Sequence, residues 1–192
     1  MTDYFALLDQ VRAPWLDQDE LKQVYHQKTF RAHPDTAALG EAENSFAQLN
    51  EAYQVLQDPK RRLHHLLELE GHVPSTSGQS LPEELQDLFP AISALAQRAG
   101  ALLEKSEKAS NALTRSLLKP QILEVQKETK ELRKKIQDLW DSSDARLHLV
   151  DSRWRNNPTG EFAALSNLYF TFAYLSRWGA ELDELAFQLS SH

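Results

Sequence analysis

The first residues that could do chemistry are His33, Pro34 and Asp35, which stand side by side in the stretch "FRAHPDTAAL" (residues 30–39). A histidine offers a compact hydrogen-bond donor and acceptor, and an aspartate offers a carboxylate that can bind an arginine through two parallel hydrogen bonds. Proline and aspartate are also ordinary turn formers. The tripeptide alone therefore predicts either a simple turn or a contact site for another protein, and the surrounding sequence must decide.

Nothing typical of an enzyme accompanies this tripeptide in the sequence. There is no serine or cysteine nucleophile in a credible triad, no phosphate-binding loop and no cluster of metal ligands. His64 and His65 are adjacent on a predicted helix, so they point to different faces and are a poor metal pair. We expect a binding protein, not an enzyme, with neither a cofactor nor a metal.

The composition excludes several other classes of protein. The net charge of −7 over 192 residues disfavours nucleic acid as the main partner, because phosphate binding needs a basic face. The absence of cysteine excludes disulfides and cysteine-ligated zinc and makes the cytoplasm the expected location. No apolar run is long enough to span a membrane, and the N-terminus "MTDYFALLDQ" lacks the features of a signal peptide. We expect no membrane contact.

The first 72 residues predict four short helices. Asp3 and Asp58 are expected N-caps, and Pro34 should end the second helix, because the residue before a proline is pushed out of helical geometry. Apolar residues recur at three- and four-residue intervals in the third helix, which is a strong helical pattern. The expected positions are "DYFALL" (residues 3–8), about 17–33, about 41–57, and from Pro59 to a stop at Gly71.

The rest of the chain predicts an antiparallel three-helix bundle behind a linker. Residues 73–80, "VPSTSGQS", are polar and contain glycine and proline, which marks a boundary. Three amphipathic segments follow, at about 80–102, 118–140 and 159–189, with a loop expected between the second and the third. Pro90 should kink or split the first segment. The fold class is all-α without strands, with domains at 1–72 and 81–192 and the linker at 73–80.

The N-terminal pattern resembles a J domain. The residues that carry the resemblance are "DYFALL", "LKQVYHQKTFRAHPD" and "FAQLNEAYQVLQDPKRRLHHLL". Tyr25 lies eight residues before His33, and "LNEAYQVLQDP" contains the J-domain pattern of Ala-Tyr-x-x-Leu followed by Asp-Pro. The resemblance implies that the protein binds a DnaK-type chaperone and accelerates ATP hydrolysis there, with His33, Pro34 and Asp35 at the contact.

A basic strip on the second helix supports this interpretation. Lys22, Lys28 and Arg31 are the only formal charges between Leu21 and Pro34, and His26 adds partial charge. Such a set is ordinarily just a solvated helix face. Its position directly before the His-Pro-Asp tripeptide favours a second chaperone-binding element.

The C-terminal part narrows the resemblance to the HscB (Jac) type of J-domain co-chaperone. There is neither a Gly/Phe-rich stretch nor a cysteine zinc repeat. The stretch "DPKRRLHHLLELEG" is similar to the family's Arg-x-x-x-Leu-Leu-x-x-x-Gly segment, on Arg62, Leu66, Leu67 and Gly71, and "YLSRWGAELDELAFQL" is similar to its closing helix. The resemblance implies a specialised DnaK-type chaperone, HscA or DnaK, and an iron–sulfur cluster scaffold protein as the client that the bundle holds.

The resemblance implies a client site on the first bundle helix, where this chain supplies Leu88 and Phe89, together with an aromatic on the last helix that maps to Tyr174. We expect these three residues to form one exposed apolar patch. The family's motif on the first bundle helix is not preserved, because Pro90 follows Phe89 and the acidic residues of the motif are missing. A J protein that delivers a different dedicated client or complex is therefore the alternative. A purely structural bundle with a degenerate J domain is disfavoured, because His33, Pro34 and Asp35 are intact.

Overall fold

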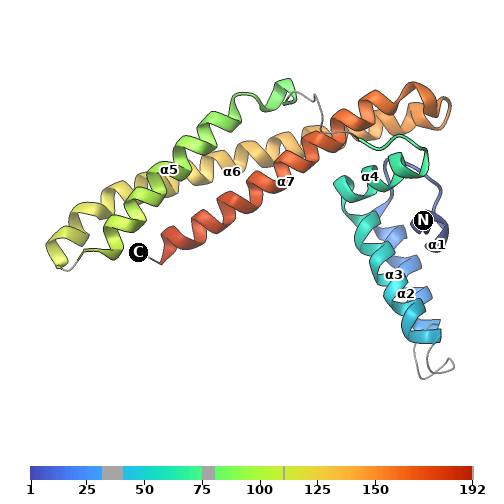
Figure 1. The fold of residues 1–192 in the computed structure, drawn as a ribbon, viewed down its shortest axis with the longest axis horizontal. Coiled ribbons are helices and arrows are strands. Elements are labelled where there is room, and N and C mark those ends of the chain that lie inside the picture. The colour runs from blue at the N-terminus through green and yellow to red at the C-terminus, as the bar shows by residue number, and fades with distance from the viewer. Residues whose placement is uncertain (32–40, 75–80, 110, 192) are drawn as a thin grey trace. The chain divides into compact units, whose positions relative to one another are not determined.

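The protein is helical throughout the part that the structure describes. In this computed structural model, residues 1–31, 41–74, 81–109 and 111–191 are described, except for the side chains of residues 41–44. Every regular element in these ranges is a helix, and none of them is a strand. The all-α fold class predicted from the sequence is confirmed (Figure 1).

The four predicted N-terminal helices are present near their expected positions. The side chain of Asp3 accepts hydrogen bonds from the backbone N–H groups of the first turn, and Asp58 accepts one from Arg61 at 2.9 Å, so both N-caps are confirmed. Gly71, which follows the last of these helices, has a φ of 75° that favours glycine. The elements are α1 (Tyr4–Leu7), α2 (Gln18–Arg31), α3 (Glu41–Gln57) and α4 (Pro59–Leu69).

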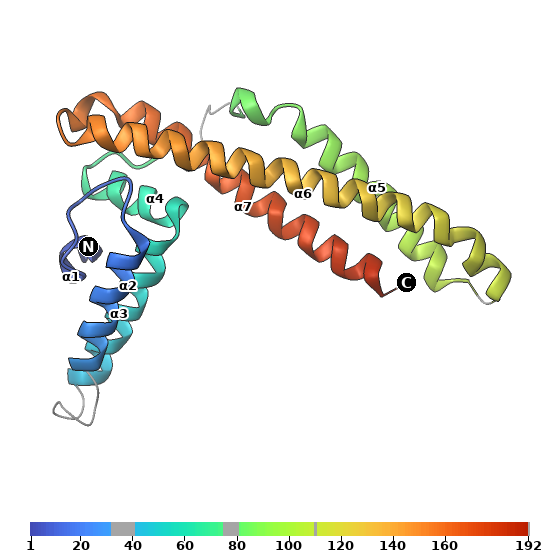
Figure 2. The same ribbon diagram turned by 180° about the vertical axis from the view of Figure 1, so that it is seen from behind.

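An aromatic stack fixes the register of α2 against α3. The two helices run side by side in both views (Figures 1 and 2). The rings of Tyr25 and Tyr53 stack with centroids 4.3 Å apart, and the Tyr25 hydroxyl donates a hydrogen bond to the side-chain oxygen of Asn50. The fully buried apolar residues of this region are Phe5, Leu8, Leu21, Ala52, Leu56, Leu63, Leu66 and Leu67.

The C-terminal part contains three long helices. One shared core joins them, with Ile92 and Leu95 from the first, Ile122 and Ile136 from the second, and Leu182 from the third among its members. This arrangement confirms the predicted helical bundle. The elements are the 3₁₀ turn Glu83–Leu85, α5 (Leu88–Glu107), α6 (Ala112–Trp154), the 3₁₀ turn Pro158–Gly160, and α7 (Phe162–Ser190).

Two sequence-based expectations about these helices are wrong. The loop expected after residue 140 is helical, because α6 continues to Trp154 and buries Leu147, Val150 and Trp154 along its extension. Pro90 neither kinks nor splits α5, because it is the third residue of a helix that begins at Leu88. The first N–H groups of a helix have no partner within it, so a proline there removes no hydrogen bond.

Contacts between Cα atoms divide the chain into two compact units. The first consists of residues 1–79 and 144–169, and the second of residues 80–143 and 170–192. We call them the J unit and the bundle unit. The J unit therefore contains the end of α6 and the start of α7 as well as the N-terminal helices. The predicted linker at 73–80 stays a prediction, because residues 75–80 lie outside the described part.

Arg62 is a buried charge at the centre of the J unit, with 2% of its surface exposed. Its guanidinium donates hydrogen bonds to the backbone oxygens of Pro14, at 2.8 Å, and Leu56, at 2.6 Å. Burial lowers the pKa of Arg62 to about 10, against the opposing effect of nearby Asp144, Asp58 and Asp151. The arginine therefore remains charged at neutral pH and joins the loop before α2 to the end of α3.

Aromatic side chains attach the end of α6 to the loop before α2, within the same unit. The Trp154 indole donates a hydrogen bond to the backbone oxygen of Arg12 at 3.1 Å. The rings of Trp15 and His148 lie 4.1 Å apart. Tyrosine and tryptophan can pack an apolar body while their polar atom binds a backbone group, so these contacts bury surface without losing a hydrogen bond.

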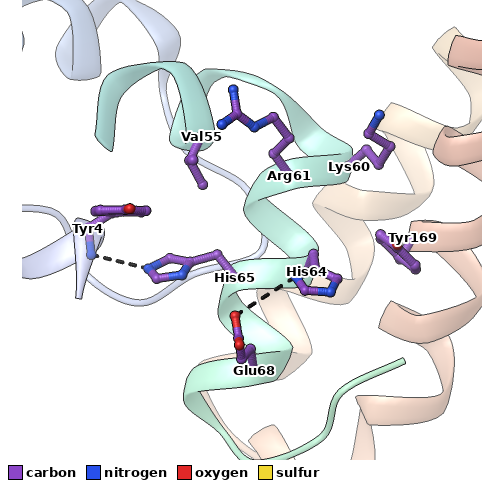
Figure 3. A pocket seen from close by; sticks show the side chains of 8 residues that line it. All are labelled: Tyr4, Val55, Lys60, Arg61, His64, His65, Glu68 and Tyr169. Carbon is purple, nitrogen blue, oxygen red and sulfur yellow. Dashed lines mark hydrogen bonds and ion pairs between the residues drawn. The ribbon is translucent and has the colours of Figure 1, made fainter. Parts of the chain in front are cut away.

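His65 holds α1 against α4 (Figure 3). Its Nε2 accepts the backbone N–H of Tyr4 at 3.1 Å, and its ring lies against the rings of Tyr4 and Phe5. Burial lowers the pKa of His65 below its ordinary value of 6.5. Protonation of Nε2 would remove the acceptor, so the fold is stabilised by the neutral imidazole.

This linkage predicts an acid-sensitive J unit. Because the folded-state pKa of His65 lies below the unfolded one, its contribution to the free energy of unfolding is present above pH 6.5 and is lost as the pH falls towards the folded pKa. The free energy of unfolding falls by at most about 1.4 kcal/mol for each pH unit within this range. Urea unfolding at pH values on either side of 6.5 measures it. We expect His65→Gln to reduce this pH dependence and the exposed neighbour variant His64→Gln to retain it; equal pH dependence in both variants would contradict the role of His65.

Candidate protein-binding surfaces

The predicted contact residues His33, Pro34 and Asp35 lie outside the described residues. The described residues stop at Arg31 and resume at Glu41. The assignment of the His-Pro-Asp tripeptide as a contact site stays a prediction from the sequence.

The predicted basic strip on α2 is divided between two flanks of the helix. Lys22 and His26 are exposed and, four residues apart, share one flank. Lys28 and Arg31 are three residues apart and lie on another flank. Lys28 forms an ion pair with Asp9 at 2.8 Å, and only 27% of its side chain is exposed. Two separate basic flanks therefore replace the single strip that the sequence suggested.

Phe30 is an exposed apolar residue of α2 that the sequence pattern did not bring to attention. It lies in the last turn of α2 and is 79% exposed. Its position is half a turn away from the buried Leu21 and the partly buried Tyr25, so it projects from the outer side of the helix. The departure of a phenylalanine from the apolar stripe of its helix was the available signal. An exposed aromatic next to basic side chains is a common interface feature.

The predicted client site is only partly a surface. Leu88 is 7% exposed and belongs to the core of the bundle unit, so the expectation that it forms part of an exposed patch is wrong. As the first residue of α5 it points inward beside Leu85, which is fully buried. The sequence placed Leu88 and Phe89 together, but consecutive residues of a helix face different directions.

Phe89 and Tyr174 flank one buried tryptophan. Phe89 is 58% exposed and its ring centroid lies 6.4 Å from that of Trp178. Tyr174 is partly buried against the core, with its ring 5.4 Å from the same tryptophan. The structure thus links these predicted residues of α5 and α7 through Trp178, and they form an aromatic cluster whose outer part is accessible.

Two adjacent histidines of α4 line a pocket of the J unit. The side chains of His64 and His65 point apart, one towards Tyr169 and the other towards Tyr4 (Figure 3). They line a pocket of about 320 Å³ with Lys60 and Arg61. No group of three or more potential metal ligands occurs among the described residues. Within the same residues, no helix combines the length and apolar character of a membrane span.

Comparison with known sequences identifies the N-terminal region. Residues 3–65 match the model of the DnaJ domain. Over 70 residues the chain is 39% identical to the chaperone protein DnaJ 2 of Aquifex aeolicus, and the matched region covers 36% of this chain and 18% of that protein. Over 104 residues it is 33% identical to the J-type co-chaperone JAC1, mitochondrial, of Saccharomyces cerevisiae, covering 48% of the chain and 55% of that protein. The chain thus spans between about a fifth and about half of these relatives.

Comparison with solved structures extends the likeness to both units. The chaperone HscB from Vibrio cholerae matches with a TM-score of 0.61 at 20% identity, covering 98% of this chain and 99% of that one. Human co-chaperone protein HscB matches with a TM-score of 0.54 at 20% identity, covering 95% and 81%. Residues 3–65 therefore contain a J domain, and the chain shares the fold of the HscB structures. This is the fold that the resemblance to the HscB (Jac) type predicted.

The contrast between Leu88 and Phe89 gives a stability test of the aromatic cluster. Leu88→Ala should lower the free energy of unfolding by about 2 kcal/mol or more, because it opens a cavity in the core. Phe89→Ala should change it by less than about 1 kcal/mol, because most of the ring is already exposed. Chemical denaturation of the two single variants measures both. A large loss for Phe89→Ala would mean that its ring is core and is unsuited to binding.

Proposed function

We propose that the protein is a J-domain co-chaperone that stimulates the ATPase of a DnaK-type chaperone and delivers to it a dedicated client, an iron–sulfur cluster scaffold protein. The observation that carries the proposal is the DnaJ-domain match over residues 3–65, within which the His-Pro-Asp tripeptide is intact. The likeness to HscB over the whole chain supports the second half of the proposal, because it includes a C-terminal bundle that could hold a client.

The tripeptide suits a contact with the chaperone. Pro34 restricts the backbone and so reduces the entropy lost on docking. Asp35 can accept two hydrogen bonds from one arginine of the partner, and His33 supplies one donor and one acceptor. The chaperone performs the hydrolysis, and this chain contributes only binding energy that favours the hydrolytic state.

The surface of α2 would complete the chaperone contact. The basic side chains Lys22, His26, Lys28 and Arg31 would steer encounter with an acidic patch, which raises the association rate. The Lys28–Asp9 ion pair reduces the net charge of its flank, where Arg31 is the second cation. Phe30 adds an apolar side chain that could be buried in the complex.

The client would bind at the aromatic cluster of the bundle unit. Phe89 and Tyr174 are the two predicted client residues that retain accessible surface, while Leu88 supports them from the core. The alternative function is delivery of a different dedicated client or complex through the same bundle. The observation that favours it is the replacement of the family's acidic motif on the first bundle helix by "LQDLFPAISALAQR" (residues 85–98).

Three further proposals concern enzymatic activity, the identity of the chaperone and the location of the protein. Human HscB and yeast JAC1, which it resembles, are named co-chaperones, and this supports a role as a binding partner and not as an enzyme. HscA or DnaK is the expected chaperone. The cytoplasm is the location that the sequence predicts, whereas the relative JAC1 carries "mitochondrial" in its name.

A single substitution tests the chaperone half of the proposal. We expect His33→Gln to abolish stimulation of the steady-state ATPase of a cognate DnaK-type chaperone, because it removes part of the contact without touching a described element. Circular dichroism should show an unchanged helix content. His64→Gln, on the exposed side of α4, is the matched control and should stimulate normally. Normal stimulation by the folded His33→Gln protein would refute the assignment.

A capture experiment with the full chain tests the client half. The full chain is needed because the J unit includes residues 144–169, so a C-terminal fragment would lose their partners. We expect immobilised protein to retain a purified iron–sulfur scaffold protein, and Phe89→Ala or Tyr174→Ala to weaken binding at least tenfold, about 1.4 kcal/mol. The control is Phe187→Ala, which removes an aromatic that is 69% exposed elsewhere on α7. Retention of another partner but no scaffold would establish the alternative.

A further inference from the structure

One face of α6 carries lysines at regular helical spacing. Lys119, Lys127, Lys130 and Lys134 lie on it together with Leu123, with intervals of four, four, three and four residues that keep them in line. All five are exposed. We call this set the lysine face. It extends roughly 22 Å at 1.5 Å per residue and belongs entirely to the bundle unit.

The lysine face places like charges next to one another. The helical neighbours of Lys130 at three and four residues are Gln126, Lys127, Arg133 and Lys134, so three of its four neighbours are cations. Like charges at these separations destabilise a helix. A face that serves only for solubility would intersperse both signs, as surface helices normally do. The fold alone gives no reason for this arrangement.

Carboxylates border the lysine face on one side only, where Glu124 lies three residues from Lys127, and Glu131 and Asp138 lie three and four residues from Lys134. Glu128 of α6 faces α5 and binds Arg98, and Asp183 of α7 binds Arg133 at 2.6 Å. Lys127 has a loose contact with Glu131 at 3.9 Å, with both side chains largely exposed. Among the residues that the structure describes, Lys119, Lys130 and Lys134 have no ion-pair partner. The face thus concentrates positive charge in a chain whose net charge is −7.

An exposed leucine interrupts the row of lysines, and the whole lysine face is accessible to solvent. Leu123 is 55% exposed between Lys119 and Lys127. In the bundle unit, α5 and α7 do not cover these side chains, because all five residues of the lysine face are exposed; Figure 2 shows α6 along its length. A row of cations with one apolar residue matches an acidic segment that carries an apolar side chain of its own.

We propose that the lysine face is a docking site for an acidic segment of a partner protein. Carboxylates of the segment pair with Lys119, Lys130 and Lys134, and one of its apolar side chains covers Leu123. Binding of the acidic segment reduces the like-charge repulsion around Lys130. The complex thus offsets the destabilisation that these charges cause in the free helix. The site lies on α6, whereas the proposed client site uses α5 and α7, so this inference is independent of the proposed function.

A protein segment fits the face better than an extended polyanion does. Duplex nucleic acid and anionic membranes present negative charge over an area larger than the lysine face, and the net charge of −7 would be repelled beyond it. A short acidic segment meets only the four lysines. Both polyanions are nevertheless included in the test, because they would use the same side chains.

Fluorescence anisotropy with the full chain tests the proposal. The probe is a fluorescein-labelled peptide of Glu-Leu-Glu-Glu repeats about as long as the face, and the matched peptide has Gln in place of every Glu. We expect only the acidic peptide to bind, with amide NMR shifts that centre on residues 119–134. The double variant Lys130→Glu with Lys134→Glu should weaken binding at least about tenfold. As a control, Lys105→Glu with Lys108→Glu changes the net charge equally at exposed positions of α5 and beyond its end, and should retain binding within about twofold.

Each other outcome would overturn the proposal. Equal weakening by both double variants would mean non-specific attraction, and equal binding of the two peptides would remove the role of the carboxylates. Phosphatidylserine vesicles and a DNA duplex are titrated in parallel. If either binds more tightly than the acidic peptide and loses binding in the Lys130→Glu, Lys134→Glu variant, the lysine face serves that polyanion. Neutral single variants, Lys130→Gln and Lys134→Gln, repeat the test if charge reversal lowers the helix content.

Discussion

The buried charge of Arg62 is the constraint around which the J unit is arranged. Removing a guanidinium from water costs several kcal/mol unless the protein replaces the lost hydrogen bonds and charge interactions. Here the backbone oxygens of Pro14 and Leu56 supply the hydrogen bonds, and Asp58, Asp144 and Asp151 supply the negative charge. These partners come from the loop before α2, the junction of α3 and α4, and the end of α6. One side chain therefore requires three separate segments to be in place at once.

The aspartates that compensate Arg62 also make contacts of their own within the J unit. The Asp58 that faces Arg62 also caps α4, so one carboxylate both stabilises the helix start and compensates the buried charge. Asp151 in turn accepts a long backbone hydrogen bond from Trp15 at 3.5 Å. The α2–α3 pair, which carries the basic flanks and Phe30, is thus held by a polar centre as well as by apolar packing. The side chains that we propose for partner binding then lie on the outside of this centre.

The sequence predicted those parts of the fold that depend on local pattern. The α3 helix, the caps at Asp3 and Asp58 and the packing stripe of α7 follow from spacing and residue type, and the structure confirms them. The continuation of α6 beyond residue 140 was missed because "DSSDAR" is polar and reads as a loop, while its burial of Leu147 depends on distant segments. Leu88 was misplaced for a different reason: its spacing from Leu85 and Ile92 is that of the core stripe, but it was grouped with its exposed neighbour Phe89 because the resemblance placed the client site there. His33, Pro34 and Asp35 were recognised as a motif, and motif recognition needs no tertiary information.

The J unit consists of two separate stretches of chain, so the ribosome supplies its parts at different times. Residues 1–79 leave the ribosome well before residues 144–169 are synthesised. At a translation rate of about 5–20 residues per second, the interval between residues 79 and 169 is roughly 5 to 20 s. During this time Arg62 has its backbone acceptors and Asp58 but neither Asp144 nor Asp151. The J unit of a nascent chain therefore passes through a stage in which its central charge is incompletely compensated, and it reaches its final stability only after residues 144–169 have been synthesised.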